Sequence, residues 1–326
     1  MISVALCSYN GEKYIEEQIN SILEQTVQVD EIVICDDGSK DKTIEVVSQV
    51  KRSSTSKTVI RTYVNEINLG VTKNFEKALS LCKGDIIFLS DQDDIWEKDK
   101  VEIMLKAFNN FDDCQLIFTD ARLVDANGTE LGVDLWDLTV PPRKENFGIR
   151  DFLGLRFVTG ATVALRKELL EHTIPIPECW IHDAWLASNA AVYGGVRSVD
   201  RRLIKYRQHE KNVIGAKKRG FTDQIRYTKA HLTDSIKFRT TMKNRVLTLY
   251  ENCKKDLLAE DIVTIKKCIV FWEESENLSK LRKLQGIEII LKNLLEGNYK
   301  KYNNGVYGAG VDFAILTVRK RIGELG

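Results

Sequence analysis

The stretch DIIFLSDQDDIW, residues 85–96, places three carboxylates within four positions directly after an apolar run. An apolar run of this length that is rich in Ile is typical of a buried strand, so Asp91, Asp93 and Asp94 are expected where that strand ends. A helix dipole would favour acids if a helix started near Glu97, but Asp91 lies too early for its first turn. The sharper interpretation is a divalent cation held by carboxylate oxygens.

Short apolar runs alternate with helix-length segments through the first third of the chain. Runs rich in Val and Ile, separated by segments with apolar spacing of three and four, indicate a doubly wound α/β fold: a mostly parallel sheet with helices on both faces. In such a sheet the ligand lies beyond the carboxyl ends of the strands. Strands are predicted over 2–7, 31–35, 58–64 and 85–90, and helices over 14–26, 42–51, 71–82 and 100–111.

Polar residues follow each predicted strand, in CSYNG, CDDGSKDKT, NEINLG and SDQDD. A turn with a helix cap would explain Ser39 or Asp41, because Ser and Asp accept backbone N–H bonds at an N-cap. It does not explain the adjacent Asp36 and Asp37, since two like charges repel unless each has its own partner. The rim of the sheet is therefore the candidate ligand site.

The composition, with 43% hydrophobic and 29% charged residues among 326, is that of a globular protein. Seven cysteines occur without a CxxC pair, so neither a disulfide framework nor a zinc cluster is predicted. No apolar run approaches the roughly 18 residues of a membrane span, and the sequence opens without the pattern of a signal peptide. A cytoplasmic location is expected.

The charge is divided along the chain. Residues 1–200 hold 21 Lys and Arg against 33 Asp and Glu, whereas residues 201–326 hold 27 against 14. From Phe221 onward, long helical patterns replace the alternation of the first part. We therefore expect a catalytic domain over 1–214 and a helical region over 215–326.

The helical region has three candidate roles: packing on the catalytic domain, building a homodimer, or contacting the inner face of the cell membrane. The cluster Lys217, Lys218 and Arg219 and the basic tail 319–321 would attract an anionic surface. The alternative is that the basic region neutralises the acidic domain, within one chain or across a dimer.

Six pieces of the sequence, spread over residues 1–215, carry a family resemblance. They are SVALCSYNGEKYIEEQINSILEQT, DEIVICDDGSKDKT, NLGVTKNF, GDIIFLSDQDDIW, IHDAWLA and YRQHEKNVIG. In order and spacing they resemble family 2 of the inverting glycosyltransferases, which implies a GT-A fold. The last three are similar to bacterial rhamnosyltransferases that use dTDP-rhamnose, with a UDP-sugar as the alternative donor. The acceptor implied is a hydroxyl of a glycan or lipid-diphosphate-linked glycan in surface polysaccharide synthesis, and no nucleic acid is implied.

The resemblance also implies roles for the donor site. Tyr9 and Asp37 match positions that hold the nucleotide base, with Asp36 beside them. Lys73 stands where the family often has Arg, so it matches a base or phosphate contact with a point charge in place of a planar fork.

Asp91 and Asp93 match the family's DxD pair on the sugar diphosphate. Asp93 would contact Mn²⁺ or Mg²⁺, and Asp94 is the additional acid of the DxDD form. His209 matches a position at the diphosphate, where imidazole binds the metal or a phosphate oxygen. Glu210 departs from the family, which usually has Gly there.

Sugar transfer also needs a carboxylate that removes the acceptor's proton. Asp183 matches the family's general base, although an acid at a helix start is by itself more often a helix-dipole residue. His182 stands where many members have Glu and is either an acceptor contact or a positioning group. Gly160 suggests close backbone approach to a ligand. Trp180 and Trp185 flank the base and suit either a sugar ring or the core.

Three other functions are consistent with part of the pattern. A haloacid dehalogenase-like phosphatase also has a DxD after a buried strand, but normally after the first one. A nucleotidyltransferase would need a Gly-rich or basic loop near the start of the chain, and CSYNGEKY is not one. A module that only binds nucleotide sugars would not need Asp183.

Overall fold

The first four long strands form a parallel sheet that brings their carboxyl ends to one edge. β1 (Ile2–Ser8) lies between β2 (Glu31–Asp36) and β4 (Ile86–Ser90), and β3 (Val59–Val64) is the outer strand. All three pairings are parallel, and Ser8 lies beside Asp36 in the register. The Val and Ile side chains of β1, β2 and β4 are buried or nearly so, whereas Val59 and Val64 of the outer strand β3 are exposed.

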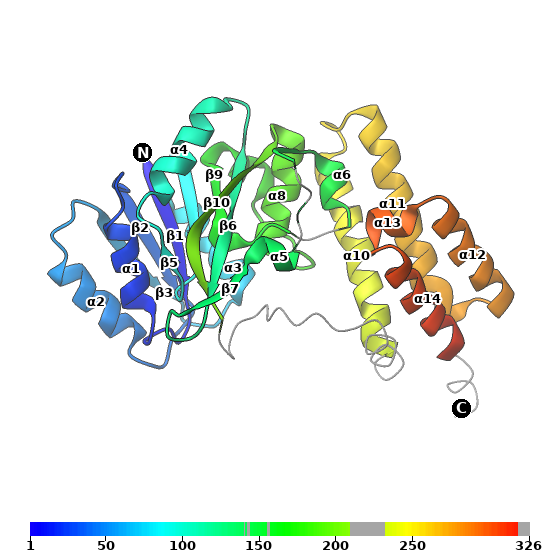
Figure 1. Cartoon of the computed structure of the whole chain (residues 1–326), viewed down its shortest axis with the longest axis horizontal. Coiled ribbons are helices and arrows are strands. Elements are labelled where there is room, and N and C mark those ends of the chain that lie inside the picture. Colours follow the sequence, from blue (N-terminus) through cyan, green and yellow to red (C-terminus); the bar gives the residue numbers. More distant parts are fainter. Residues whose placement is uncertain (140, 142–143, 155–156, 209–231, 319–326) are drawn as a thin grey trace. The chain divides into compact units, whose positions relative to one another are not determined.

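Beyond β4 the sheet becomes mixed, with the strand order β3-β2-β1-β4-β9-β6-β10-β5 (Figure 1). β9 (Val163–Arg166) runs antiparallel to both β4 and β6 (Leu116–Val124), while β10 (Val196–Arg207) runs parallel to β6. β5 (Ile95–Trp96) pairs antiparallel with β10, which places the loop after β4 beside the end of β10. The sheet was predicted to be mostly parallel, and this holds for its first four strands.

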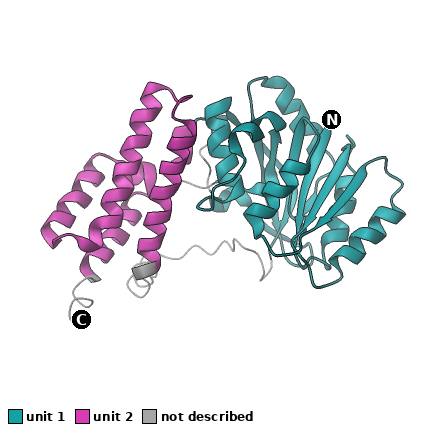
Figure 2. Cartoon of the chain, turned by 180° about the vertical axis from the view of Figure 1, so that it is seen from behind, with its two compact units in different colours: residues 1–148, 157–215 teal, residues 149–156, 216–326 magenta. Residues whose placement is uncertain are grey.

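The structure is a computed structural model that describes residues 1–139, 141, 144–154, 157–208 and 232–318. The chain divides into two compact units, residues 1–148 with 157–215 and residues 149–156 with 216–326 (Figure 2). The remaining elements of the first unit are α1 (Ile15–Leu23), α2 (Thr43–Ser53), α3 (Val71–Leu81), α4 (Lys100–Asn110), β7 (Glu130–Asp134), α5 (Leu135–Thr139), β8 (Asn146–Phe147), α7 (Leu170–Thr173) and α8 (His182–Tyr193).

The second unit is helical. α11 (Ala259–Asn277) packs against α10 (Leu232–Cys253), and the rings of Phe271, Trp272 and Tyr299 fill its core. No helix among the described residues is long and apolar enough to cross a membrane. The other helices of this unit are α6 (Ile149–Phe152), α12 (Lys283–Leu295), α13 (Asn298–Tyr302) and α14 (Val306–Val318).

The domain boundary differs from the expectation of 1–214 and 215–326. The segment 149–156 belongs to the helical unit, and no pattern in the sequence indicates this. α4 begins at Lys100, as predicted, and the alternative of a helix that starts near Glu97 is wrong, because β5 pairs with β10 before the helix starts. Within the long helical patterns expected from Phe221 onward, α11 ends at Asn277, a short 3-10 turn follows over Leu278–Lys280, and α12 begins at Lys283. The basic cluster 217–219 and the tail 319–321 lie outside the described residues.

Candidate active site

Three carboxylates occupy the loop that follows β4, at the carboxyl edge of the sheet. Asp94 is 1% exposed: its Oδ1 accepts the backbone N–H of Arg207 at 3.0 Å, and its Oδ2 has no partner among the described residues. Burial, then the charges of Asp93 and Asp91, raise the pKa of Asp94 well above its usual value. Burial, then the charges of Asp93 and Asp183, raise the pKa of Asp91 to about 7. Among the described residues, positive charge near this loop therefore does not fully compensate its carboxylates.

Lys100, the first residue of α4, is the buried cation beside these acids. It is 0% exposed, its Nζ donates to the carbonyl of Ala161 at 2.8 Å, and the ammonium lies 3.9 Å from the centre of the Trp96 ring. Burial lowers the pKa of Lys100 to about 7, although the charges of Asp94 and Asp91 act in the opposite direction. The sequence analysis treated Lys100 only as the start of a helix. Its burial next to the acids depends on the fold and left no local signal.

Arg207, the last residue of β10, fixes the shape of the acidic loop. Its guanidinium is 2% exposed, donates from Nε to the carbonyl of Asp93 at 2.8 Å, and pairs with Glu17 at 2.6 Å. The guanidinium also lies 4.6 Å from the centre of the Tyr14 ring. Its backbone N–H donates to the carboxylate of Asp94, so Arg207 holds two of the three acidic residues of the loop, Asp93 by its backbone and Asp94 by its side chain. The sequence analysis did not single out Arg207.

Asp183 lies in the first turn of α8, far along the chain from the acids of the loop. Its Oδ2 accepts the backbone N–H of Gly160 at 3.2 Å, and its Oδ1 accepts the N–H of Ala184 at 2.6 Å. Its negative charge contributes to the raised pKa of Asp91, so the two carboxylates share one electrostatic environment. Residues about ninety positions apart thus meet at one site.

His182 stands next to Asp183 and is buried, with 5% of its surface exposed. Its ring stacks on Phe75 at 4.0 Å between centroids, and neither ring nitrogen has a partner among the described residues. Burial lowers the pKa of His182, which favours the neutral imidazole. A Cβ at Gly160 would stand 2.7 Å from His182 Nε2. The close approach expected between the Gly160 backbone and a ligand is therefore, in this structure, an approach to the His182 ring.

The two tryptophans beside Asp183 are core residues in this structure. Trp185 is 1% exposed, and its indole N–H donates to the carbonyl of Thr173 at 2.7 Å. Trp180 is 7% exposed and packs against Trp185 with ring centres 5.4 Å apart. Of the two roles left open for these tryptophans, a sugar contact or the core, their burial favours the core.

Asp36 and Asp37 each have their own partners, and this removes the repulsion noted from the sequence. Asp36 accepts hydrogen bonds from the hydroxyl of Ser8 and the N–H of Ser39, both at 2.8 Å. Asp37 accepts the backbone N–H groups of Leu69 and Gly70 at 2.7 and 2.9 Å. The local turn explains only the bond from Ser39 to Asp36, since the partners of Asp37 lie 32 and 33 positions further along the chain. Among the hydrogen bonds described, Asp37 Oδ2 accepts one, from Gly70, so it can still accept a second from a nucleotide base.

Tyr9 and Lys73 differ in how accessible they are. Tyr9 is 48% exposed, and the side chain of Gln92 holds its backbone from both sides, at 2.8 and 3.1 Å. Lys73 binds Glu76 at 2.8 Å and the carbonyl of Ile176 at 2.7 Å. Its ammonium is therefore already engaged. His209 lies outside the described residues.

Comparison with known proteins places this arrangement in a family. The sequence pattern of the family described as Glycosyl transferase family 2 matches residues 3–174, more than half of the chain. The chain belongs to glycosyl transferase family 2. It is 31% identical over 230 residues to the dTDP-rhamnosyl transferase RfbG of Shigella flexneri, across 65% of this chain and 74% of that protein.

Other family 2 relatives are matched over less of their length. The chain is 27% identical over 217 residues to an uncharacterized glycosyltransferase of Nostoc, which covers 65% of this chain and 66% of that protein. It matches 18% of the chondroitin synthase of Escherichia coli, at 31% identity over 128 residues. The chain therefore spans less than two thirds of several relatives.

Solved structures show the same GT-A-like fold. Residues 1–349 of S. aureus TarS superimpose with a TM-score of 0.59 at 16% identity, covering 100% of this chain and 92% of that one. A mannosyltransferase of Pyrobaculum calidifontis, solved with GDP-Man and Mn²⁺, gives a TM-score of 0.51 at 17% identity, covering 98% of this chain and 87% of that one. At these identities the likeness shows the fold alone.

The acidic loop of this glycosyltransferase suits a divalent cation that shares its coordination with a substrate. In the described part of the chain, no three His, Cys, Asp or Glu side chains converge into a metal cage. Mg²⁺ is typically held by one or two carboxylates together with substrate phosphates and water. The unpartnered Asp94 Oδ2 and the raised pKa of Asp91 fit such a partial site.

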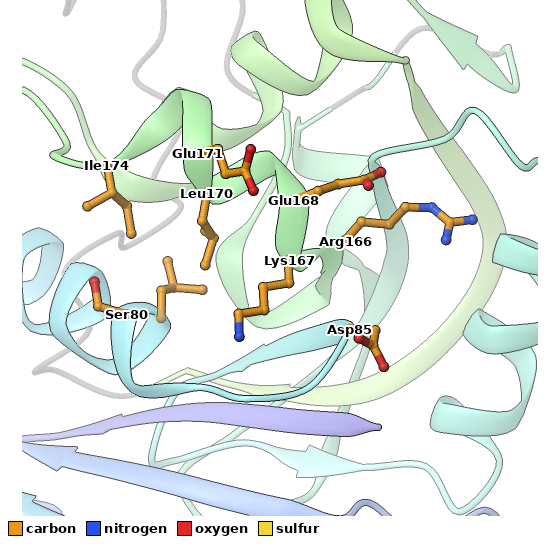
Figure 3. A pocket seen from close by; sticks show the side chains of 9 residues that line it. Ser80, Asp85, Arg166, Lys167, Glu168, Leu170, Glu171 and Ile174 are labelled. Carbon is orange, nitrogen blue, oxygen red and sulfur yellow. The ribbon is translucent and has the colours of Figure 1, made fainter.

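A pocket of about 600 Å³ lies at the opposite edge of the sheet and is not this site. Asp85, which precedes β4, and Arg166, which ends β9, line it together with Lys167 and Glu171 (Figure 3). None of the acids described above borders this pocket. We therefore assign the chemistry to the carboxyl edge.

Proposed function

We propose that this chain transfers a sugar from a nucleoside diphosphate to an acceptor hydroxyl, with inversion at the anomeric carbon. One observation supports the proposal: Asp183, at the start of α8, acts electrostatically on Asp91 in the acidic loop after β4, where Asp94 is buried. The carboxylates of the loop suit the cation of a sugar diphosphate, and the carboxylate of α8 suits the acceptor's proton. Family membership favours this reading over a phosphatase or a nucleotidyltransferase.

The residues of the acidic loop would hold Mn²⁺ or Mg²⁺ on the donor. Asp93 is the proposed metal ligand, and Asp91 and His209 are proposed to share the metal and diphosphate. When bound, the cation would neutralise the charge that develops on the departing diphosphate. Asp94 and Arg207 keep the loop in one shape through the hydrogen bonds at 3.0 and 2.8 Å. Binding a cation together with the donor requires a site whose negative charge is not compensated before the donor binds.

Asp183 is the proposed general base. A base must be held in position while keeping an oxygen lone pair for the incoming proton. The hydrogen bonds from Gly160 and Ala184 fix the carboxylate, and each of its oxygens accepts a single bond in the set described. A module that only bound nucleotide sugars would have no use for this second acid.

Rhamnose carried on dTDP is the donor we propose. The support is the 31% identity to the Shigella flexneri dTDP-rhamnosyl transferase over 230 residues. The class of donor has broader support, because similar folds are known with UDP-GlcNAc and with GDP-Man. We propose a glycan or lipid-diphosphate-linked glycan as the acceptor, reached from the cytoplasm. Tyr9 and Asp37 would contact the base at the open end of β1 and β2.

Thermal unfolding with candidate ligands tests the donor class. We expect stabilisation by dTDP or UDP in the presence of Mn²⁺, because a ligand that binds only the folded state raises its stability. Phosphate monoesters and nucleoside triphosphates serve as comparison ligands. Stabilisation by a monoester alone would favour a phosphatase and contradict the proposal. Hydrolysis of a panel of nucleotide sugars then identifies the donor, and a preference for UDP-sugars would overturn the assignment to dTDP-rhamnose.

A further inference from the structure

The helix α12 exposes a stripe of leucines that the fold of its own unit does not use. Leu284, Leu291 and Leu295 are 81%, 53% and 89% exposed. Their spacing of seven and four residues puts them on one side of the helix. The opposite side carries Gly286, where a Cβ would stand 2.4 Å from Leu316 of α14, and the buried Ile290. α12 is therefore apolar on both sides, and the described residues of the chain cover only one of them.

Basic residues stand at both ends of this stripe. Lys280, Arg282 and Lys283 precede or begin α12, and two more lysines, at 300 and 301, follow it in α13. Residues 280–318 contain six Lys and Arg in all and three Asp and Glu.

The acids of the same segment offset little of this charge. Asp312 is 0% exposed and pairs with Arg239, so it does not contribute to the surface. Glu296 and Glu288 are exposed, and Glu288 lies on the leucine side of α12. Lys292 is bound to Glu274 at 2.7 Å. The surface around the leucine stripe is consequently basic at its ends, with one acid between the leucines.

We propose that this face of α12 docks on an anionic lipid bilayer. An amphipathic helix with leucines on one face and Lys or Arg beside them lies in the plane of the interface, with its apolar face among the headgroups. With 13 residues α12 is about 20 Å long, too short to cross the hydrocarbon core. Glu288 limits the depth, so the leucines reach the headgroup boundary and the basic residues contact lipid phosphates.

This inference deepens the proposed function, on which it rests for the expectation of a lipid-linked acceptor. It places the surface on described residues of α12, and not on the basic tail at 319–321. Its test requires no sugar transfer. Vesicle binding can therefore fail while nucleotide binding persists, and the two proposals remain distinguishable.

Co-sedimentation of the full chain with phosphatidylglycerol and phosphatidylcholine vesicles tests the surface. We expect binding at low salt that weakens at physiological salt, and little binding to pure phosphatidylcholine. The triple variant Leu284→Gln, Leu291→Gln, Leu295→Gln should lower partitioning at least about tenfold, since each buried leucine contributes that much. Because the three side chains are exposed, its thermal unfolding should match the parent chain.

The matched control removes two exposed apolar side chains elsewhere in the same unit. Leu258 and Val263 are 65% and 53% exposed at the start of α11. Leu258→Gln with Val263→Gln should leave vesicle binding unchanged. An equal loss in the control would overturn the assignment to α12, as would full-length protein that stays in the supernatant at both salt levels.

Glu288→Lys separates a bilayer from a second copy of this chain. On an anionic bilayer an additional cation on the docking face should increase binding severalfold. In an antiparallel pair of α12 helices Glu288 would face Lys292 of the partner, so the same change would weaken a dimer. Sedimentation equilibrium measures the dimer directly. A dimer that the leucine variant dissociates, without vesicle binding by the parent chain, would overturn the bilayer proposal.

Discussion

The two units each bury charged side chains, and they differ in whether those charges are satisfied. In the helical unit Arg239 and Asp312 form a closed network: Asp312 accepts from Arg239 Nε at 2.8 Å, from Ser275 at 2.8 Å and from the Tyr299 hydroxyl at 2.7 Å. In the sheet unit Asp94 Oδ2 has no partner among the described residues, and burial raises the pKa of Asp91 to about 7.

This difference separates a structural cluster from a functional one. In a buried ion pair that is fully hydrogen-bonded, the charges are already compensated in the free protein. The acidic loop, with the buried Asp94 and one buried lysine of lowered pKa, lacks such compensation, and we expect it to gain stability when a cation binds. The satisfied network predicts a role in folding, and the unsatisfied one predicts a role in binding. The following variants test that division.

The largest effect is expected from the acidic loop. Asp93→Asn removes a charge with little change of shape and should reduce sugar transfer to background, because the proposed metal ligand is lost. Asp91→Asn should weaken donor binding in the presence of Mn²⁺. Transfer is measured by product formation, and binding by thermal shift. Full activity in excess chelator, or in Asp93→Asn, would remove the basis for a metal-dependent mechanism.

Asp183→Asn should separate chemistry from binding. We expect turnover to fall by about 10²- to 10⁴-fold, the contribution of a positioned general base. Donor affinity should remain, since Asp183 is held by Gly160 and Ala184 and not by the acidic loop. Single-turnover rates and dTDP binding measure the two quantities. Equal losses in both would indicate a structural role for Asp183.

Asp312→Asn should have the opposite signature in the helical unit. Arg239 would remain buried without its counter-charge, which typically costs about 3–5 kcal/mol of unfolding free energy. Urea unfolding followed by circular dichroism measures this loss. Asp256, which is exposed, provides a comparison through Asp256→Asn. Stabilisation by dTDP and Mn²⁺ should persist in both variants, and its loss in Asp312→Asn alone would show that the two clusters are not separate in function.

The smallest effect is expected from Arg207→Lys. The charge remains, but the planar fork that holds the Asp93 carbonyl and Glu17 is lost. A residue that orients metal ligands typically changes metal affinity by about 10- to 100-fold. The Mn²⁺ concentration for half-maximal turnover should rise accordingly. Arg202→Lys on the same strand is the control, since Arg202 pairs with Asp134 at 2.7 Å away from the loop. Equal shifts in both would contradict a positioning role for Arg207.

The sequence predicted the first four strands and their helices to within a few residues at each end. There the hydrophobic period is regular, and each strand pairs in parallel with partners close by in the chain. The second half of the sheet was not predicted, because β9 and β6 are antiparallel neighbours from distant segments. The family resemblance located Asp91, Asp93 and Asp183, and the structure brings Asp91 and Asp183 into one electrostatic environment.

By itself the sequence determined the α/β class, the rim of polar residues after the strands, and membership of a glycosyltransferase family. Local patterns suffice for these, because strand periodicity and short motifs are written in neighbouring residues. Only the tertiary structure decided that Lys100 and Arg207 belong with the acids, that Trp180 and Trp185 are core, and that α12 leaves its leucines exposed. The burial of a side chain and the pairing of its charge depend on contacts between segments that are distant in the sequence, and no local pattern predicts those contacts.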